Sequence, residues 1–317
     1  MANRIKEKYM AGKRYFDYPM LFLVIFLICF GLVMIYSTSS YKSTVTYGNS
    51  YHWLLRQAVA IVLGAVAMVV CCKLDYHIIK SEKFGNGCYW ASIVLLVLVL
   101  IIGAAKKGAV RWISIAGFQF QPSEVSKILV VIYLANRLSA NAHKIRTFKD
   151  SIVIVLPTVP IIALIVTQNL STALVVCSMI GVMLFVVSPK MKELMLTAGG
   201  GIILLFVYLL TANSYRNERV QIWLHPESHK KGFQTMQALY AIGSGGIFGK
   251  GLGQSMQKMG FIPESHNDMI FSIICEELGL FGAVCLILVF VALIFRMLLI
   301  ALNTEDLFGS LIVIGFM

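Results

Sequence analysis

The sequence predicts an all-α polytopic membrane protein, and three observations carry this prediction. Hydrophobic residues make up 58% of the 317 residues, whereas only 13% are charged, about half the share found in soluble domains. Several apolar runs approach the ~20 residues with which a helix crosses a bilayer while pairing its own backbone groups. Basic residues are concentrated in alternate loops between these runs, as expected of cytoplasmic loops.

The first apolar run, 19–36, follows a segment that is rich in Lys and Arg. The run lacks a small-residue cleavage site, so we interpret it as a retained first span behind a cytoplasmic tail, 1–18. Residues 19–317 are expected to form one transmembrane domain. Further spans are predicted at 54–72, 88–104, 124–138, 151–167, 171–187, 194–212 and 270–295. A partial ninth begins near 307 and is too short to cross, so we expect this chain to be a fragment.

The loops set the predicted orientation. With the tail inside, the inner loops 73–87, 137–150 and 188–193 hold nine Lys and Arg residues, whereas the short outer loops 37–53 and 168–170 hold one, Lys42. Between the fifth and sixth spans the chain must turn tightly, and Asn169 or Ser171 is available to cap the next helix.

Two outer segments are basic despite this bias. One is 105–124, and the other is the long extracellular loop 213–269 before the eighth span. Long loops translocate regardless of charge, but basic groups at the outer leaflet suit an anionic, phosphorylated lipid ligand. Contact with lipid headgroups alone is the alternative. Because the long loop is rich in glycine, we expect it to pack against protein and to be partly re-entrant.

Asp268 lies at the outer end of the eighth span and is the first candidate for chemistry. A carboxylate there can act as a general base toward a hydroxyl of a lipid-linked substrate. The alternative is a helix cap, in which Asn267 or Asp268 accepts hydrogen bonds from the amides of Ile270 or Phe271.

Glu276 and Glu277 lie two turns deeper in the same span. Consecutive side chains point about 100° apart on a helix, so both cannot face lipid. A buried, hydrogen-bonded structural role is favoured over catalysis.

A second candidate site surrounds the start of the fourth span. Ser123 can cap the helix, Glu124 then lies in its first turn, and Lys127 is placed to pair with Glu124. This arrangement is either a capped helix start or, with Arg111, a grip for a diphosphate.

No metal or nucleotide site is indicated. His266 has no partner at metal-ligand spacing, and His225 and His229 flank Pro226 in a loop. The glycine-rich run 243–253 lacks the Lys-Ser/Thr of a phosphate loop. The seven cysteines lie in or beside apolar runs and predict no disulfide. The net charge of +12 is explained by topology and lipid rather than by nucleic acid.

These motifs resemble the SEDS family (shape, elongation, division and sporulation proteins). The resemblance rests on GAVRWI at 108–113, QPSE at 121–124, NLSTA at 169–173 and the long tract 241–279, and it covers nearly the whole chain. Within the family, 251–258 is more similar to the division and sporulation members than to the elongation member.

The resemblance implies ten spans, of which this chain would hold eight and part of a ninth. It implies polymerisation of lipid II at the outer face of the bacterial plasma membrane, at the division septum. The implied partners are a class B penicillin-binding protein, other division-complex membrane proteins and membrane lipids. Asp268 matches the essential aspartate of the family's Pro-Glu-x-His-Thr-Asp-Phe motif. The predicted substrate-binding residues are Arg111, Trp112, Glu124, Lys127, Arg216, Arg219, Lys258, Glu264, His266 and Glu277.

The chain departs from the family pattern at three places. Asn267 replaces the usual Thr, Met269 replaces the usual Phe, and 168–171 (QNLS) stands where Pro-Asp-Leu-Gly is common. No cofactor is predicted, and the sequence leaves open whether Mg²⁺ or Mn²⁺ helps the leaving group. A lipid II flippase and a non-catalytic division scaffold are the alternative functions. Only an enzyme requires a carboxylate at 268.

Overall fold

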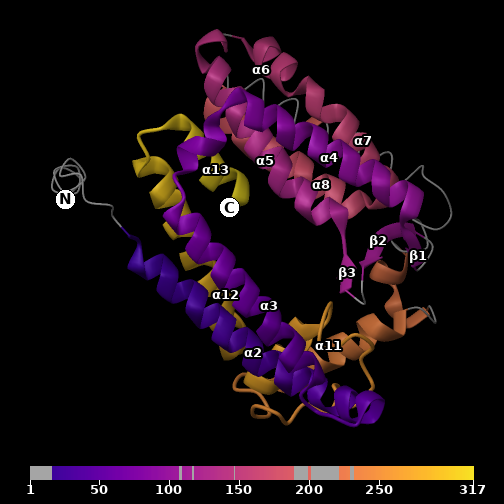
Figure 1. The fold of residues 1–317 in the computed structure, drawn as a ribbon. Helices are drawn as coiled ribbons and strands as arrows, with labels where there is room; N and C mark the ends of the chain where they lie inside the picture. The colour runs from indigo at the N-terminus through magenta and orange to yellow at the C-terminus, as the bar shows by residue number, and fades with distance from the viewer. Residues whose placement is uncertain are drawn as a thin grey trace. The chain divides into compact units, whose positions relative to one another are not determined.

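The computed structural model describes residues 16–106, 109–115, 118–145, 147–188, 199–200, 221–228 and 232–317. The chain forms two compact units, each built from two separate stretches of sequence. The first comprises Met1–Met68 and Asn213–Arg296, and the second comprises Val69–Ala212 and Met297–Met317. The described secondary structure is mainly helical, with one small sheet (Figure 1).

The first unit contains most of helix α3 (His52–Lys73), all of α2 (Tyr18–Tyr47) and α11 (Phe233–Gly245), and α12 (Ile270–Asn303) as far as Arg296. α2 continues well beyond the predicted end at residue 36. Its last turns are rich in Ser and Thr, and three of these hydroxyls, on Thr38, Ser40 and Thr44, donate to carbonyls three or four residues earlier in the helix. These polar side chains are thus accommodated within the helix, which continues to Tyr47.

The second unit packs α4 (Glu82–Ile102), α5 (Pro122–Asn141), α7 (Val159–Gln168), α8 (Leu170–Val187) and α13 (Leu307–Phe316) around one apolar core. The fully buried Leu96, Leu134, Met183 and Phe308 belong to this core. A Cβ on Gly315 of α13 would collide with Val131, so a glycine permits the close approach of α13 to α5. The Asn169 side chain caps α8, which confirms one of the two predicted caps.

The predicted fifth span is interrupted. It consists of α6 (Phe148–Val155), a single 3-10 turn (Leu156–Thr158) and α7. Pro157 and Pro160 lack the amide hydrogen that a continuous α-helix needs, and proline rings crowd the preceding turn. The break therefore follows from the sequence.

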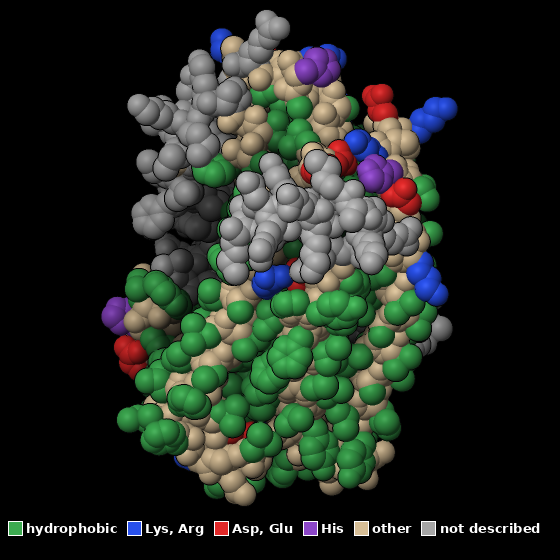
Figure 2. Space-filling model, turned by 90° about the vertical axis from the view of Figure 1, so that its left-hand side faces the viewer, with side chains coloured by type: hydrophobic (Ala, Val, Ile, Leu, Met, Phe, Trp, Pro, Cys, Tyr) green, Lys and Arg blue, Asp and Glu red, His purple; other side chains and the backbone are tan. Residues whose placement is uncertain are grey.

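Six helical segments are long and apolar enough to cross a membrane within the described part of the chain. They are Tyr18–Tyr47, His52–Lys73, Glu82–Ile102, Lys149–Gln168, Leu170–Val187 and Ile270–Asn303. The prediction of a multi-pass membrane protein is confirmed. Figure 2 shows a face covered largely by hydrophobic side chains, as expected of helices in contact with lipid.

The other three predicted spans have different outcomes. The run 124–138 forms α5, which is absent from those six segments and carries Glu124, Lys127 and Arg137. The run 194–212 lies outside the described residues except for 199–200, which are helical. The last run forms the short apolar helix α13.

A three-stranded antiparallel sheet occupies most of the segment that was interpreted only as a basic outer loop. Its strands are β1 (Ala104–Lys106), β2 (Ala109–Ile115) and β3 (Phe118–Phe120), in the order β1-β2-β3. No sheet was expected in this segment. The β-branched and aromatic residues in β2 and β3 favour extended backbone.

Candidate functional site

Helix α12 is broken near its N-terminal end. Gly279 adopts φ 68° and ψ −170°, a conformation open essentially to glycine alone, so Ile270–Leu278 form a separate half-helix. The break leaves carbonyls of the half-helix and amides of the following helix without helical partners. Within a membrane segment such groups must be paired by other protein groups.

The loop that follows α11 supplies those partners. The amides of Lys250 and Gly251 donate to the carbonyls of Glu276 and Glu277, each at 2.9 Å. In the other direction, the amides of Leu280 and Phe281 donate to loop carbonyls at 2.9 and 3.0 Å. This loop therefore packs into the break, in agreement with the expectation that the glycine-rich segment packs against protein.

Glycines allow this close packing. A Cβ added to Gly249 would meet the carbonyl of Glu277, and one added to Gly279 would meet the backbone of Ile247 and Gly249. Gly245 likewise faces the backbone of Cys275. The glycine-rich tract is therefore required for contact between two stretches of backbone.

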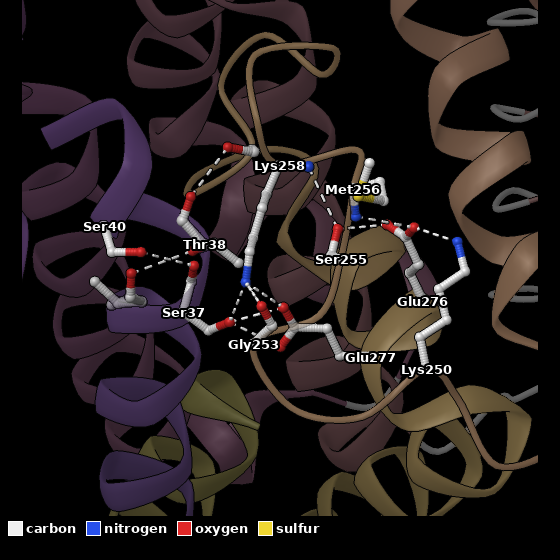
Figure 3. A network of polar contacts seen from close by, with 12 residues as sticks. Ser37, Thr38, Ser40, Lys250, Gly253, Ser255, Met256, Lys258, Glu276 and Glu277 are labelled. Atoms are coloured by element: carbon white, nitrogen blue, oxygen red, sulfur yellow. Dashed lines mark hydrogen bonds and ion pairs between the residues drawn. The ribbon is translucent and has the colours of Figure 1, made fainter. Parts of the chain in front are cut away.

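Glu276 is fully buried and binds one side of this loop. Its carboxylate accepts hydrogen bonds from Lys250 Nζ at 2.7 Å, from the Ser255 hydroxyl and from the amide of Met256 at 3.3 Å (Figure 3). Such a set of donors is what keeps a buried carboxylate stable in its charged form.

Glu277 is also fully buried, but it binds a different lysine. Lys258 Nζ lies 2.8 Å from Glu277 Oε1, and the Ser37 hydroxyl of α2 donates to the same carboxylate at 2.7 to 2.8 Å (Figure 3). Lys258 Nζ also donates to the carbonyl of Gly253 at 2.7 Å and to Ser37 Oγ at 3.1 Å. The ammonium group thus has one acceptor for each of its three hydrogens.

Both glutamates are buried and hydrogen-bonded, as predicted, and their structural role stays a prediction. Lys258 and Glu277 were also predicted to bind substrate. In this structure the two side chains bind each other, and a direct contact with a ligand would require this ion pair to open. If the ion pair stays closed, Lys258 and Glu277 can affect the substrate only through the residues that contact the pair.

Asp268 lies in the turn that leads into α12, and its side chain is exposed. Among the described residues, neither the Asn267 nor the Asp268 side chain accepts a hydrogen bond from the first amides of α12. The amide of Ile270 bonds instead to the backbone carbonyl of Asn267 at 3.3 Å, and the Asn267 side chain donates to Glu264 at 3.0 Å. No hydrogen bond or ion pair to the Asp268 carboxylate occurs within this part of the structure, so it is open to a ligand.

Glu264 is in the same turn and has a left-handed backbone, with φ 57°. Among the described residues it is the only non-glycine residue with positive φ. Backbone strain of this kind, about 1–3 kcal/mol, often marks functional turns. It is consistent with the predicted role of the 263–269 motif.

His266, from the same motif, is buried. Its ring lies against the Trp53 ring, with centroids 4.8 Å apart, and its Nδ1 atom has no partner within the described part of the chain. Burial lowers the pKa of His266 below its usual value, and Lys42 lowers it further, whereas Glu264 acts in the opposite direction. The neutral form of this imidazole is therefore favoured more than in an ordinary histidine.

The predicted site at the start of α5 lies in the second unit, and its cap was assigned wrongly. Pro122 is the first helical residue and Gln121 takes the capping position, without a side-chain cap. Proline's fixed φ suits the first position of a helix, so the helix begins before Ser123 can cap it. Gln121 Nε2 instead donates to the Ser123 hydroxyl at 3.0 Å.

The predicted pair of Glu124 and Lys127 is confirmed, at 2.7 Å. Arg111 and Trp112 are both on β2, and the Trp112 side chain is half-buried. Arg216 and Arg219 lie outside the described residues. Within the described ranges, no group of three His, Cys, Asp or Glu side chains is arranged to hold a metal ion.

Helix α2 also contributes residues to this site, which was not expected from the sequence. Ser37 binds Glu277 and Lys258, the Thr38 carbonyl accepts from Ser265 at 3.3 Å, and Lys42 affects His266. The available signal was a run of hydroxyl-bearing residues directly after an apolar span, where polar groups need partners.

The chain is similar in sequence to known proteins. The family model FtsW/RodA/SpoVE, described as cell cycle protein, matches residues 18–317. The "Probable peptidoglycan glycosyltransferase FtsW" of Geobacter metallireducens is 35% identical over 310 residues, which cover 95% of this chain and 81% of that protein. "Stage V sporulation protein E" of Bacillus subtilis is 34% identical over 309 residues, covering 94% and 82%.

Solved structures are also similar. A chain from "Structural coordination of polymerization and crosslinking by a peptidoglycan synthase complex" matches with a TM-score of 0.75 and 28% identity, covering 96% of this chain and 83% of that one. The rod shape determining protein RodA of Thermus thermophilus matches with a TM-score of 0.67 and 26% identity, covering 96% and 81%. The chain therefore belongs to the FtsW/RodA/SpoVE family of cell cycle proteins.

Proposed function

We propose that this protein is a peptidoglycan glycosyltransferase that polymerises lipid II into glycan strands for septal cell-wall synthesis, with Asp268 as the general base. This chain covers more than four fifths of two relatives that are named probable peptidoglycan glycosyltransferases. The assignment of the base rests on the Asp268 carboxylate, which is exposed and has no hydrogen bond among the described residues. Asp268 lies just before the half-helix, and the loop that follows α11 binds the other end of that half-helix. This carboxylate is free to accept a proton.

The proposed step is a displacement at a sugar carbon. The Asp268 carboxylate takes the proton of the acceptor's 4-hydroxyl, and that oxygen attacks the anomeric carbon of the donor. The bond from this carbon to the diphosphate breaks, and undecaprenyl diphosphate leaves with the bonding electrons. The product is a β-1,4 linkage with inverted configuration at the donor carbon.

The leaving group accumulates negative charge and requires cations. We assign this role to Arg111 and Lys127, with Arg216 and Arg219 as further candidates. Trp112, Glu264 and His266 are proposed to contact the substrate, and Glu124 to orient Lys127, with which it pairs at 2.7 Å. A divalent cation, Mg²⁺ or Mn²⁺, would contribute the same kind of charge neutralisation.

The proposed setting is the bacterial plasma membrane at the division septum. The N-terminus would be cytoplasmic and the Asp268 turn would face outward, as the distribution of basic residues favours. A class B penicillin-binding protein is the proposed partner, since a similar solved structure is described as a complex for polymerization and crosslinking. Other division proteins would recruit this pair.

The test is glycan-chain formation from purified lipid II, using the full-length protein with its penicillin-binding partner in liposomes. We expect Asp268→Asn to bind lipid II and to form no polymer, because the amide cannot take the proton. Glu305→Gln, the same chemical change at another exposed carboxylate, should leave polymerisation unchanged.

The outcomes separate the functions. Equal polymer from wild type and Asp268→Asn would show that the base is placed wrongly. If wild type makes no polymer beside an active partner, the flippase or scaffold alternative takes its place. A lipid II transport assay in the same liposomes then separates those two.

A further inference from the structure

One turn of α2 contacts the Asp268 segment on both sides of the aspartate. On the N-terminal side, the Ser265 hydroxyl donates to the carbonyl of Thr38 at 3.3 Å. On the C-terminal side, the Ser37 hydroxyl donates to Glu277 at 2.7 to 2.8 Å. Because Ser37 and Thr38 are adjacent, the stretch that carries Asp268 is held at two points by one short piece of helix. Figure 3 shows the contact between Ser37 and Glu277.

Of these contacts, the Ser37 hydroxyl has the most partners. It donates to the Glu277 carboxylate and accepts from Lys258 Nζ at 3.1 Å, so it closes a triangle with both ends of the buried ion pair. It is also the only described donor to Glu277 Oε2. Removing it would leave one carboxylate oxygen and one ammonium hydrogen unpaired in a buried site.

The ion pair itself would survive that loss. Lys258 would still contact Glu277 at 2.8 Å and Gly253 at 2.7 Å, and the backbone hydrogen bonds around Gly279 do not involve Ser37. What would be lost is the direct link from α2 to the half-helix. The Ser37 hydroxyl therefore affects where the half-helix lies more than whether it forms.

We propose that Ser37 is a positioning residue for Asp268, acting through Glu277 to hold the half-helix Ile270–Leu278 in register with α2. This inference rests on the proposed function, because positioning has a kinetic meaning only if Asp268 acts as the base. A displacement of about 1 Å in a reacting group can lower a rate by about 100-fold. A loss of the Ser37 link should therefore appear in the turnover number, and the affinity for lipid II should be little affected.

The experiment measures kcat and KM for lipid II polymerisation per folded molecule, in the full complex with the penicillin-binding partner. Ser37→Ala removes the hydroxyl, Ser37→Thr keeps one, and Ser40→Ala removes a hydroxyl of the same helix that bonds only to the Ser37 carbonyl, at 3.4 Å. We expect Ser37→Ala to lower kcat by about tenfold or more and to change KM less than about twofold. Ser37→Thr should recover most of the lost kcat, and Ser40→Ala should match wild type.

Three results would overturn the proposal. One is a kcat of Ser37→Ala within twofold of wild type. Another is a fall in kcat together with a comparable rise in KM, which would indicate a general loss of structure at the site. The third is a Ser37→Thr protein that is as stable as wild type and as slow as Ser37→Ala. Asp268→Asn, assayed alongside, tells whether a failure belongs to this inference or to the proposed function: if Asp268→Asn polymerises normally, the proposed base is wrong whatever Ser37 does.

Discussion

Glu276 and Glu277 are adjacent in the chain, yet their carboxylates bind different lysines of one loop, Lys250 at 2.7 Å and Lys258 at 2.8 Å. The angle between consecutive helical side chains directs them to different parts of the loop. Two buried carboxylates thus fix a segment that connects α11 to the Asp268 motif. The same residues accept loop amides through their carbonyls, so backbone and side chains hold the same contact.

The two ion pairs should differ in their contribution to stability. The Lys258 side chain is 6% exposed, so Glu277→Gln leaves a buried charge without its counter-ion and should cost about 3–5 kcal/mol. The Lys250 side chain is 36% exposed and can turn toward water, so Glu276→Gln should cost less, about 1–3 kcal/mol. Thermal unfolding of both variants in detergent shows which of them loses more stability. Equal losses, or a larger loss for Glu276→Gln, would contradict it.

A second prediction concerns the break in α12. Gly279→Ala puts a Cβ at φ 68° and against the backbone of Gly249 and Ile247. Strain and collision together should cost at least about 3 kcal/mol. We expect that little folded Gly279→Ala protein remains when heated samples are analysed by size-exclusion chromatography.

The matched control for this break is Gly243→Ala in α11, where an added Cβ meets nothing within 4 Å. There alanine should be neutral or stabilising by up to about 1 kcal/mol. If the two variants behave alike, the break in α12 does not depend on glycine.

The local features of the fold were predictable, whereas the contacts between distant segments were not. The Asn169 cap follows from the tight turn, and the Glu124–Lys127 pair follows from i,i+3 spacing. The cap at Ser123 was predicted wrongly because Pro122 begins the helix. The link from Ser37 to Glu277 joins residues 240 positions apart, and no local pattern encodes such a pairing.

In the candidate site, too, local features were predictable and contacts between distant segments were not. Asp268 was identified from its motif, and the amide of Ile270, one of the two that a cap could bind, bonds to the Asn267 backbone carbonyl instead. The break at Gly279 could not be predicted, because a glycine inside an apolar span is compatible with a continuous helix. Only the loop packed against it explains why the helix opens there.

A third prediction separates binding from stability at Lys127. Its ion pair with Glu124 lies on one helix and the Glu124 side chain is 53% exposed, so Lys127→Gln should change stability by no more than about 1 kcal/mol. If Lys127 binds the diphosphate, the same change should raise KM for lipid II about tenfold, the loss of one charge-assisted hydrogen bond. Steady-state polymerisation measures KM. Lys83→Gln, at an exposed lysine of α4, is the control, and an equal KM in both variants would contradict this role.

The last prediction concerns the pH dependence of stability at His266. Burial, and next Lys42, lower its pKa below the ordinary value of 6.5 against the opposing effect of Glu264. Folding therefore favours the neutral ring. The unfolded chain binds more protons in the window from 6.5 down to the folded pKa, so stability rises with pH there. The contribution of His266 is complete above 6.5 and is lost as pH falls below it.

His266→Phe keeps a ring against Trp53 and removes the titration. Wild type should lose more thermal stability than His266→Phe between about pH 7.5 and about pH 5.5, whereas His143→Gln, at an exposed histidine, should follow wild type. Differential scanning fluorimetry at the two pH values measures the difference. Because the acidic residues titrate identically in all three proteins, equal losses for wild type and His266→Phe would mean that this ring is not the group responsible.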